Sequence, residues 1–168
     1  MTDIFTDLKV PIQKLLDEYN VKSSAELLHE LENLLISSAA TQTDYKETRE
    51  VLHSLRTEYR LAMITNTFPQ GFETMCVKYA LKDYFEIILT SYQEHVTKPS
   101  PVIFAKLLKE SQLRPSEILF VGDSLESDIL PTEKLGLKNL LIDRRDRYPH
   151  YPSRIHDLRE IFTSLPSK

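Results

Sequence analysis

The 168-residue chain has few of the features that mark secreted, membrane-spanning or nucleic-acid-binding proteins. Its single cysteine, Cys76, excludes a disulfide within the chain. No apolar run approaches the roughly 20 residues that a helix needs to cross a bilayer. The formal net charge is -4 and the lysines and arginines are dispersed, so we expect neither nucleic acid nor a membrane as a partner. The polar first residues lack the basic and apolar regions of a secretion signal, which predicts a cytoplasmic protein.

Glycine is also scarce, with three in the whole chain, and Gly122 is the most informative of them. It ends the apolar run Ile118 to Val121, which fits a strand buried on both faces. Asp123 therefore follows the carboxyl end of a strand. In open parallel sheets, ligands bind at this edge, because strand ends and helix starts converge there.

Oxygen donors continue after Asp123, at Ser124, Glu126 and Asp128. Asp123 and Asp128 could together hold one hard cation such as Mg²⁺, which prefers carboxylate and water ligands. The same residues suit a helix start, because serine and aspartate are favoured caps and acids suit a helix N-terminus. The residues alone leave both interpretations open.

The first third of the chain predicts two amphipathic helices, one over 11–19 and one starting at Ser24. Ser23 and Ser24 are candidate caps of the second helix. The small polar residues at 37–43 predict a connection and a boundary, so we expect a helical segment over 1–43. The apolar stripes of the two helices are most simply core surface, and they consist of Ile12, Leu15, Leu16, Tyr19, Leu27, Leu28, Leu31, Leu34 and Leu35.

From Asp44 onward the pattern alternates between helix and strand, and we expect a second segment over 44–168. Asp44 followed by Glu47 resembles a helix start. Such alternation predicts parallel βαβ units in a three-layer α/β sheet with helices on both faces. The expected strands are 61–64, 87–89, 118–121 and 140–142. One expected helix carries the buried stripe Val51, Leu52 and Leu55, and two others cover 72–79 and 102–108.

Polar residues follow three of the expected strands: Thr65 with Asn66, then Lys98, then Asp123. A hydroxyl with backbone amides can hold phosphoryl oxygens, a lysine can neutralise their charge, and carboxylates can hold Mg²⁺. Each residue also has an ordinary interpretation as a turn, a solvated charge or a cap. Their occurrence together at one edge of one sheet favours a phosphate and metal site.

The stretches LAMITN, KPSPVIF and ILFVGDSLESDI, followed by EKLGLKNLLI, resemble motifs two, three and four of the haloacid dehalogenase (HAD) superfamily. The resemblance covers about residues 44–165 and implies a Rossmann-type parallel sheet, with residues 1–43 as part of a helical cap. It implies that Thr65 and Lys98 are catalytic, Thr65 binding the transferring phosphoryl group and Lys98 stabilising it. It also implies that Asp123 and Asp128 hold Mg²⁺.

The chain departs from this family in one respect. HAD enzymes begin with a central apolar strand that ends in an aspartate nucleophile, and no such strand is evident here. Asp3 has only two residues before it, and Asp143 ends the last expected strand, at what the resemblance makes a sheet edge. We therefore expect weak or no Mg²⁺ binding and self-association through exposed strand edges. Without the central strand, the sheet would have a gap between the strand that ends at Thr65 and the strand that precedes Asp123. The chain would then be a poorly stable fragment, or residues 1–8 or a partner chain would fill the gap, or the two neighbouring strands would pair directly.

Two functions follow. The first is a HAD-like phosphohydrolase that acts on a small phosphorylated substrate with Mg²⁺, truncated and inactive as given. The second is a non-catalytic HAD-fold binding or scaffold protein, a pseudoenzyme. Retention of the four motif residues favours the first, and the coding sequence upstream of the start would discriminate the two.

The stretch 144–154 is rich in arginine, tyrosine and histidine. We expect a solvated loop there rather than a surface for an anion or a partner, because two prolines make it irregular and its charges are mixed. His150 and His156 lack the spacing of a zinc site.

Overall fold

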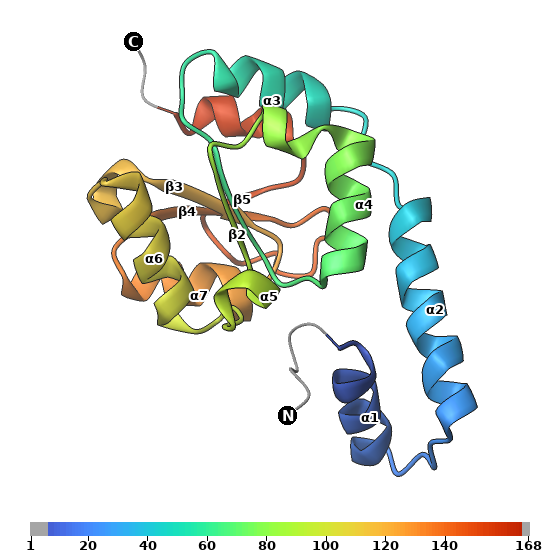
Figure 1. The fold of residues 1–168 in the computed structure, drawn as a ribbon. Coiled ribbons are helices and arrows are strands. Elements are labelled where there is room, and N and C mark those ends of the chain that lie inside the picture. Colours follow the sequence, from blue (N-terminus) through green and yellow to red (C-terminus); the bar gives the residue numbers. More distant parts are fainter. Residues whose placement is uncertain (1–6, 166–168) are drawn as a thin grey trace.

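A computed structural model describes residues 7–165, which form an α/β core with a projecting helical hairpin (Figure 1). The strands are β1 Ala62–Thr65, β2 Ile87–Thr90, β3 Leu119–Gly122, β4 Lys138–Ile142 and β5 Arg154–Ile155. The helices are α1 Lys9–Glu18, α2 Ala25–Thr41, α3 Thr48–Arg56, α4 Pro69–Tyr79, α5 Ser91–Glu94, α6 Pro101–Ser111 and α7 Leu130–Lys134. Short 3-10 turns are η1 Leu81–Asp83, η2 Pro115–Glu117 and η4 Leu158–Thr163, and η3 Leu125–Ile129 is a π-helical turn.

The strands form two separate parallel sheets in the described part of the chain. One sheet has the order β1-β2 and the other β3-β4-β5. In register, Ile64 aligns with Leu89, and Val121 aligns with Leu140. The predicted parallel α/β class is confirmed. Direct pairing of β1 with β3, one of the outcomes considered for the gap, is not what this structure has.

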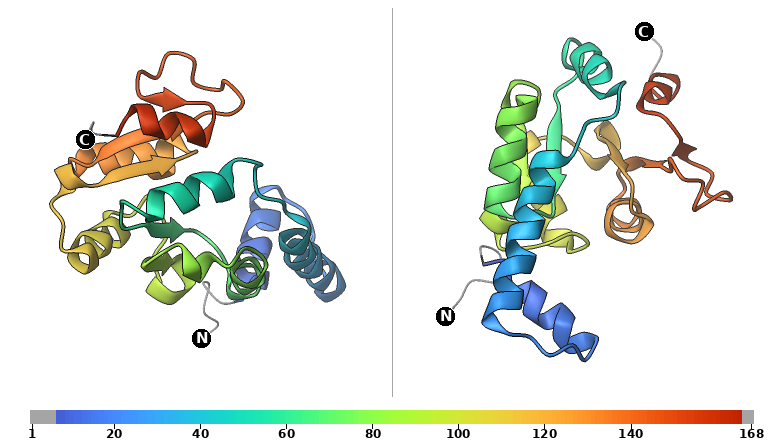
Figure 2. Two further views of the ribbon diagram at one scale, coloured as in Figure 1. Left: turned by 90° about the horizontal axis from the view of Figure 1, so that it is seen from above. Right: turned by 90° about the vertical axis from the view of Figure 1, so that its right-hand side faces the viewer.

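Helices cover both faces of these sheets, which gives the predicted three layers (Figure 2). On one face, α3 and η4 pack on β4 and β5. On the other face, α6 packs on β1 and β2, with Phe120 of β3 at its margin. The buried members of the first cluster are Val51, Leu55, Leu140, Ile155 and Ile161, and those of the second are Ile64, Leu89, Ile103, Phe104 and Leu107.

Strand β3 differs from its prediction. All four of its residues, Leu119 to Gly122, are only partly buried, although the apolar run predicts burial on both faces. Strand β3 pairs with β4 alone, so its other edge faces an open space instead of a neighbouring strand. The expectation of a fully buried strand is therefore wrong, because burial here depends on a neighbour that the described chain does not provide.

Helix α2 is longer than the sequence predicts and ends at Thr41. The hydroxyls of Ser37, Ser38 and Thr41 each donate to a backbone carbonyl three residues earlier, so these polar residues are satisfied within the helix. Ala39 is buried beside α4, where a methyl group at Gly71 would lie 3.4 Å from its Cβ. The predicted connection is therefore wrong over 37–41, where small residues allow close helix packing, and the chain leaves the helix only at Gln42.

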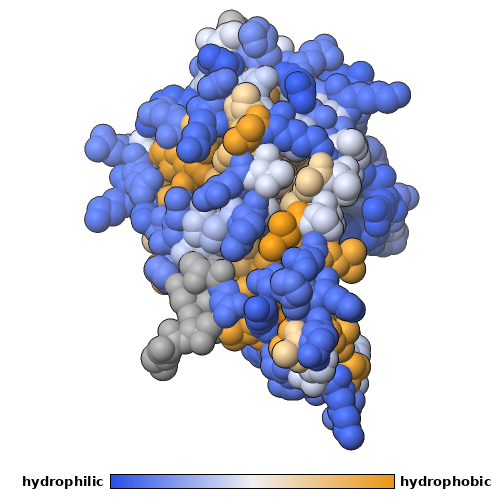
Figure 3. Space-filling view, turned by 45° about the vertical axis from the view of Figure 1, so that its right-hand side comes forward, coloured by the Kyte–Doolittle hydropathy of each residue, from blue (hydrophilic) through white to orange (hydrophobic). Residues whose placement is uncertain are grey.

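The projecting hairpin, α1 with α2, carries apolar side chains that face outward. The core interpretation of its stripes is wrong for Leu34, which is 62% exposed, and for Tyr19, which is 72% exposed. Figure 3 shows apolar surface over the projecting part of the molecule. The predicted cap at Ser24 is confirmed, since its hydroxyl accepts a hydrogen bond from the Leu27 N–H. Within residues 7–165, no helix has the length and apolar content needed to cross a membrane.

The predicted helix start at Asp44 and Glu47 is wrong, because α3 begins at Thr48. Asp44 instead pairs with Arg49 at 2.7 Å. Glu47 is buried and pairs with Arg144 at 2.6 Å. The sequence pattern assigns the Glu47 side chain to a helix cap, but this side chain pairs with an arginine almost a hundred positions away.

Candidate active site

The loop after β1 and the loop after the short helix α5, which follows β2, are joined by a reciprocal pair of hydrogen bonds. The Asn66 side-chain amide donates to the Lys98 carbonyl at 3.0 Å, and the Lys98 backbone N–H donates to Asn66 Oδ1 at 2.8 Å. Asn66 directly follows Thr65, the last residue of β1. The sequence expectation that these residues meet at one edge of a sheet is thus met for Asn66 and Lys98.

Lys98 then reaches across to the second sheet. Its Nζ donates to Asp128 Oδ1 at 2.6 Å, and the two side chains are only 15% and 3% exposed. Asp128 lies in η3, which follows β3. A charged hydrogen bond between two largely buried groups is short and strong, so this pair ties the carboxyl edges of the two sheets together.

The π-helical turn η3 and Gly122 set the position of Asp128. Ser124 N–H donates to Asp128 Oδ2 at 3.1 Å, and Ser124 Oγ accepts from the Ser127 N–H at 3.1 Å. A Cβ added at Gly122 would lie 2.4 Å from the Asp128 Cβ, closer than side chains approach. Glycine is therefore needed here for close packing of the carboxylate on the strand end. Ser124 caps the turn, as predicted, while Asp128 points to Lys98.

Asp123 is exposed at the end of β3, and its carbonyl accepts a hydrogen bond from Arg147 Nη2 at 3.1 Å. Thr65 is partly buried and aligns with Thr90 of β2. The structure therefore joins Asn66, Lys98 and Asp128 in one chain of hydrogen bonds. Thr65 and Asp123 lie next to these hydrogen bonds, because Asn66 follows Thr65, and Ser124, which donates to Asp128, follows Asp123.

The carboxylates of Asp123 and Asp128 are hard oxygen donors, which are the ligands that a cation such as Mg²⁺ prefers. Residues 7–165 contain no group of three or more histidine, cysteine, aspartate or glutamate side chains arranged to hold a metal. Both oxygens of Asp128 already accept hydrogen bonds, from Lys98 and from Ser124. An ion at this edge would therefore compete with Lys98 and Ser124 for Asp128 and would keep most of its waters.

Asp143 has a structural environment. It is 1% exposed and accepts backbone hydrogen bonds from Arg147 at 2.9 Å and Tyr148 at 2.7 Å. Burial raises the pKa of Asp143, but these N–H donors and the cations Arg154 and Arg147 outweigh burial and bring the pKa below its usual value. The carboxylate closes a turn, which agrees with the prediction that it is no nucleophile. Its strand β4 is not at the sheet edge, because β5 pairs beyond it, so that expectation is wrong. Asp3 lies outside the described residues.

Arg144 is the main residue that the sequence reasoning undervalued. Its guanidinium lies 3.7 Å from the centre of the Tyr45 ring and pairs with buried Glu47, and its side chain is 19% exposed. The prediction of a solvated loop over 144–154 is wrong at Arg144 and at Tyr151. The Tyr151 hydroxyl contacts Glu133 at 2.5 Å. Burial and the neighbouring Glu133 raise the pKa of Tyr151 to about 12. An arginine within two residues of a strand end was the available signal.

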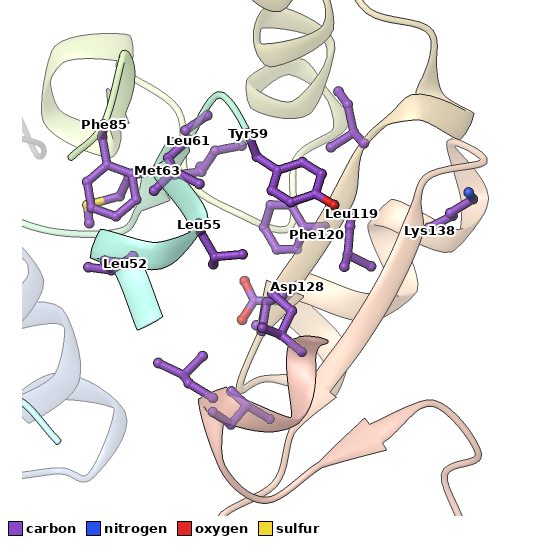
Figure 4. A pocket seen from close by; sticks show the side chains of 18 of the residues that line it. Leu52, Leu55, Tyr59, Leu61, Met63, Phe85, Leu119, Phe120, Asp128 and Lys138 are labelled. Carbon is purple, nitrogen blue, oxygen red and sulfur yellow. The ribbon is translucent and has the colours of Figure 1, made fainter. Parts of the chain in front are cut away.

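A cavity of about 1040 Å³ separates the two sheets (Figure 4). Lys98, Asp123 and Asp128 lie at its polar end, with Arg144 and Arg147. Figure 4 shows Leu52 and Leu55 on one side of the space and Leu119 and Phe120 on the other. The remaining lining is mainly apolar and comes from α3, β1, β3 and η4.

Comparisons with known proteins agree with this architecture. The family model described as haloacid dehalogenase-like hydrolase matches residues 4–136. The HAD hydrolase YfnB from Bacillus subtilis, solved with bound magnesium, has TM-score 0.76 and 21% identity, over 95% of this chain and 72% of that one. The HAD phosphatase from Thermococcus onnurineus has TM-score 0.69 and 25% identity, over 91% and 69%. The 2-haloacid dehalogenase from Pseudomonas syringae pv. Tomato DC3000 has TM-score 0.67 and 20% identity, over 82% and 60%.

No curated protein gave a match. The chain spans 60% of the length of the Pseudomonas dehalogenase. Because the family model covers most of the chain, the chain belongs to the haloacid dehalogenase-like hydrolases.

Proposed function

We propose that this chain provides the phosphate-binding and metal-binding part of a HAD-like phosphohydrolase site for a small phosphorylated substrate. The observation that carries the proposal is the set of hydrogen bonds from Asn66 through Lys98 to Asp128, which joins segments that follow β1, β2 and β3. The haloacid dehalogenase-like family includes structures named as phosphatases and as dehalogenases, so the family alone leaves the substrate open. A lysine bonded to a carboxylate, at the edge where Thr65 ends β1 and Asp123 follows β3, favours phosphoryl chemistry, because this set of groups matches an anion that carries Mg²⁺.

Each residue has a role in this proposal. The Thr65 hydroxyl and the Asn66 backbone hold phosphoryl oxygens, and Lys98 neutralises their charge. Asp123 and Asp128 hold Mg²⁺, which supplies charge screening of the phosphoryl group when bound. The magnesium in the YfnB structure supports the choice of ion. The hairpin of α1 and α2 serves as part of a cap beside the site.

We expect residues 1–168 alone to hydrolyse phosphate monoesters very slowly or not at all. Asp143, the aspartate that follows β4, is buried and bonded to two backbone N–H groups, so it cannot attack a substrate. An aryl phosphate assay with Mg²⁺ tests this. Turnover near one per second, within the usual enzyme range and abolished in Asp123→Asn, would show that a nucleophile is present after all.

Binding can be tested without turnover. Titration of inorganic phosphate with Mg²⁺, followed by amide chemical shifts, should move Thr65, Asn66 and Lys98. The variant Lys98→Met should weaken the phosphate response at least tenfold, whereas Lys109→Met, at an exposed position of α6, should leave it unchanged. Equal affinity in the two variants would remove Lys98 from the site.

The second candidate is a HAD-fold binding protein without catalysis. The closed ion pair between Lys98 and Asp128 favours it, since each charge already satisfies the other. This candidate predicts that phosphate and Mg²⁺ cause no shifts at Lys98 or Asp128. The proposed phosphohydrolase site predicts that both ligands perturb this pair.

A further inference from the structure

The loop that follows β4 carries charges of both signs, and the fold separates them. Residues 143–147 read Asp-Arg-Arg-Asp-Arg, a mixture that in the sequence favours a solvated loop. The Asp143 carboxylate fixes the backbone of this loop, because it accepts the N–H groups of Arg147 and Tyr148. The arginine side chains of the loop therefore start from a fixed turn at the end of β4.

Both aspartates of the loop are neutralised by one residue of β5. Arg154 pairs with Asp143 at 3.5 Å and also with Asp146. The Arg154 side chain is largely buried there. The negative charge of the loop is therefore compensated at β5, and neither aspartate forms an ion pair with an arginine of the loop itself.

Arg144, the first arginine of the loop, is also taken up by the protein. It pairs with buried Glu47 at 2.6 Å, and its guanidinium lies 3.7 Å from the centre of the Tyr45 ring. These contacts hold the segment before α3 against the loop after β4. Arg144 is therefore a structural cation and is not free for a ligand.

Arg145 and Arg147 remain, and both line the cavity beside Lys98 and Asp123. Both are exposed, and neither forms an ion pair with a carboxylate of residues 7–165. Arg147 Nη2 donates to the Asp123 carbonyl at 3.1 Å, which fixes the position of its guanidinium. A guanidinium has five N–H donors, so most of the donors of Arg147 are available to a ligand.

The bond to Asp123 sets how far a ligand of Arg147 lies from the candidate phosphate site. In the proposed function, the Asp123 carboxylate holds Mg²⁺ beside the phosphoryl group, while its carbonyl holds Arg147. These are two groups of one residue, so an anion on Arg147 lies close to the phosphoryl group. A planar guanidinium binds the oxygens of a carboxylate or a phosphate in pairs, which gives such an anion a defined position.

We propose that Arg145 and Arg147 form a second anion subsite, and that the substrate is a short phosphate ester with a second oxyanion one or two carbon atoms from the phosphate. The second oxyanion is a carboxylate or another phosphate. This inference rests on the proposed function, because it requires the phosphoryl group to lie at Lys98. Phosphate esters of neutral alcohols are poorer ligands, because they leave both guanidinium groups without an anion.

The test compares ligands that differ only in the second group, titrated into the full chain and followed by chemical shifts. Phosphonoacetate carries a carboxylate, and phosphonoacetamide replaces it with a neutral amide of the same shape. Phosphonoacetate should bind about tenfold more tightly, because its second group accepts charge-assisted hydrogen bonds. The titrations are made without Mg²⁺, so that chelation of the ion cannot create the difference.

A third ligand, methylenebisphosphonate, distinguishes the two kinds of second oxyanion. Tighter binding than that of phosphonoacetate would identify a second phosphate, and weaker binding would identify a carboxylate. The Nε–H signals of Arg145 and Arg147 should shift with phosphonoacetate and not with phosphonoacetamide. This measurement uses the parent chain and does not depend on the folding of a variant.

Variants of the chain complete the test. Arg145→Met and Arg147→Met should each reduce the tenfold preference for phosphonoacetate to about threefold or less. Arg56→Met is the matched control, because Arg56 is exposed on α3 and lies 5.7 Å from the centre of the Tyr84 ring, as Arg147 does from the Tyr148 ring. Arg56 does not line the cavity, so its variant should keep the full preference.

The outcomes separate this inference from the proposed function. Equal affinity for phosphonoacetate and phosphonoacetamide, with both weakened in Lys98→Met, would overturn the second subsite and leave the phosphate site in place. Affinities that do not change in Lys98→Met would overturn both proposals. A loss of preference in Arg56→Met as large as in Arg147→Met would indicate a general effect of net charge and would overturn the second subsite.

Discussion

The two sheets differ in what they bring to the site and in how they are supported. The β1-β2 sheet supplies Thr65, Asn66 and the cation Lys98, while the β3-β4-β5 sheet supplies the carboxylates Asp123 and Asp128. The second sheet holds its loops with buried Asp143 and the Glu47–Arg144 pair. The first has two short strands and is tied to the second at the site by one ion pair. Because Lys98 and the two carboxylates belong to separate sheets, the distance between the sheets sets the distance between the charged groups of the site.

The largest effect should come from the pair that joins the sheets. Lys98→Met leaves the Asp128 carboxylate largely buried without its cation, and removal of one partner of such a pair costs about 3–5 kcal/mol. Urea unfolding should show this loss in Lys98→Met and a smaller loss in the double variant Lys98→Met with Asp128→Asn. If the losses in stability of the two single variants simply added up in the double variant, Lys98 and Asp128 would not be coupled, and the ion pair would not link the two sheets energetically.

Two glycines provide a contrast, Gly122 at the end of β3 and Gly71 in α4 beside the hairpin helix α2. Gly122→Ala forces a Cβ to within 2.4 Å of Asp128 and should cost about 1–3 kcal/mol by overpacking. Gly71→Ala in α4 meets Ala39 at an ordinary 3.4 Å and should stabilise by about 0.5–1 kcal/mol, because alanine is the better helix former. Thermal unfolding of both variants measures the difference. Equal effects would show that Asp128 does not pack on Gly122.

Acid should weaken the β3-β4-β5 sheet through Asp143. Its pKa in the folded chain lies below the ordinary 3.8, so its stabilising contribution is complete above that pH and is lost as the pH falls through the folded pKa. Asp143→Asn should therefore be less stable than the parent chain at pH 7, and the difference should shrink toward pH 2. A constant difference across this range would contradict the ionised state assigned to Asp143.

The smallest effect should be confined to the projecting hairpin. Ser24→Ala removes the hydroxyl that accepts the Leu27 N–H, and loss of such a cap costs about 0.5–2 kcal/mol of helix stability. Phosphate binding and the amide exchange of β3 should not change. Altered exchange at Leu119 would show that the hairpin and the core unfold as one unit.

Residue patterns along the chain determined β1 to β4 and the helices α3, α4 and α6, and they missed β5 and the short helices α5 and α7. They succeeded because a strand in the interior of an α/β sheet needs an apolar run, whether or not both of its edges are paired. The cap at Ser24 and the meeting of Asn66 with Lys98 follow from such short-range rules.

Only the tertiary structure decided the division of the sheet, the role of Glu47 and the length of α2. Glu47 pairs with Arg144, and Ala39 packs at Gly71, so both outcomes depend on partners far away along the chain. The half-buried state of β3 likewise depends on an edge that meets a cavity. Local preferences amount to about a kilocalorie per mole or less per residue, and burial against a distant partner exceeds them.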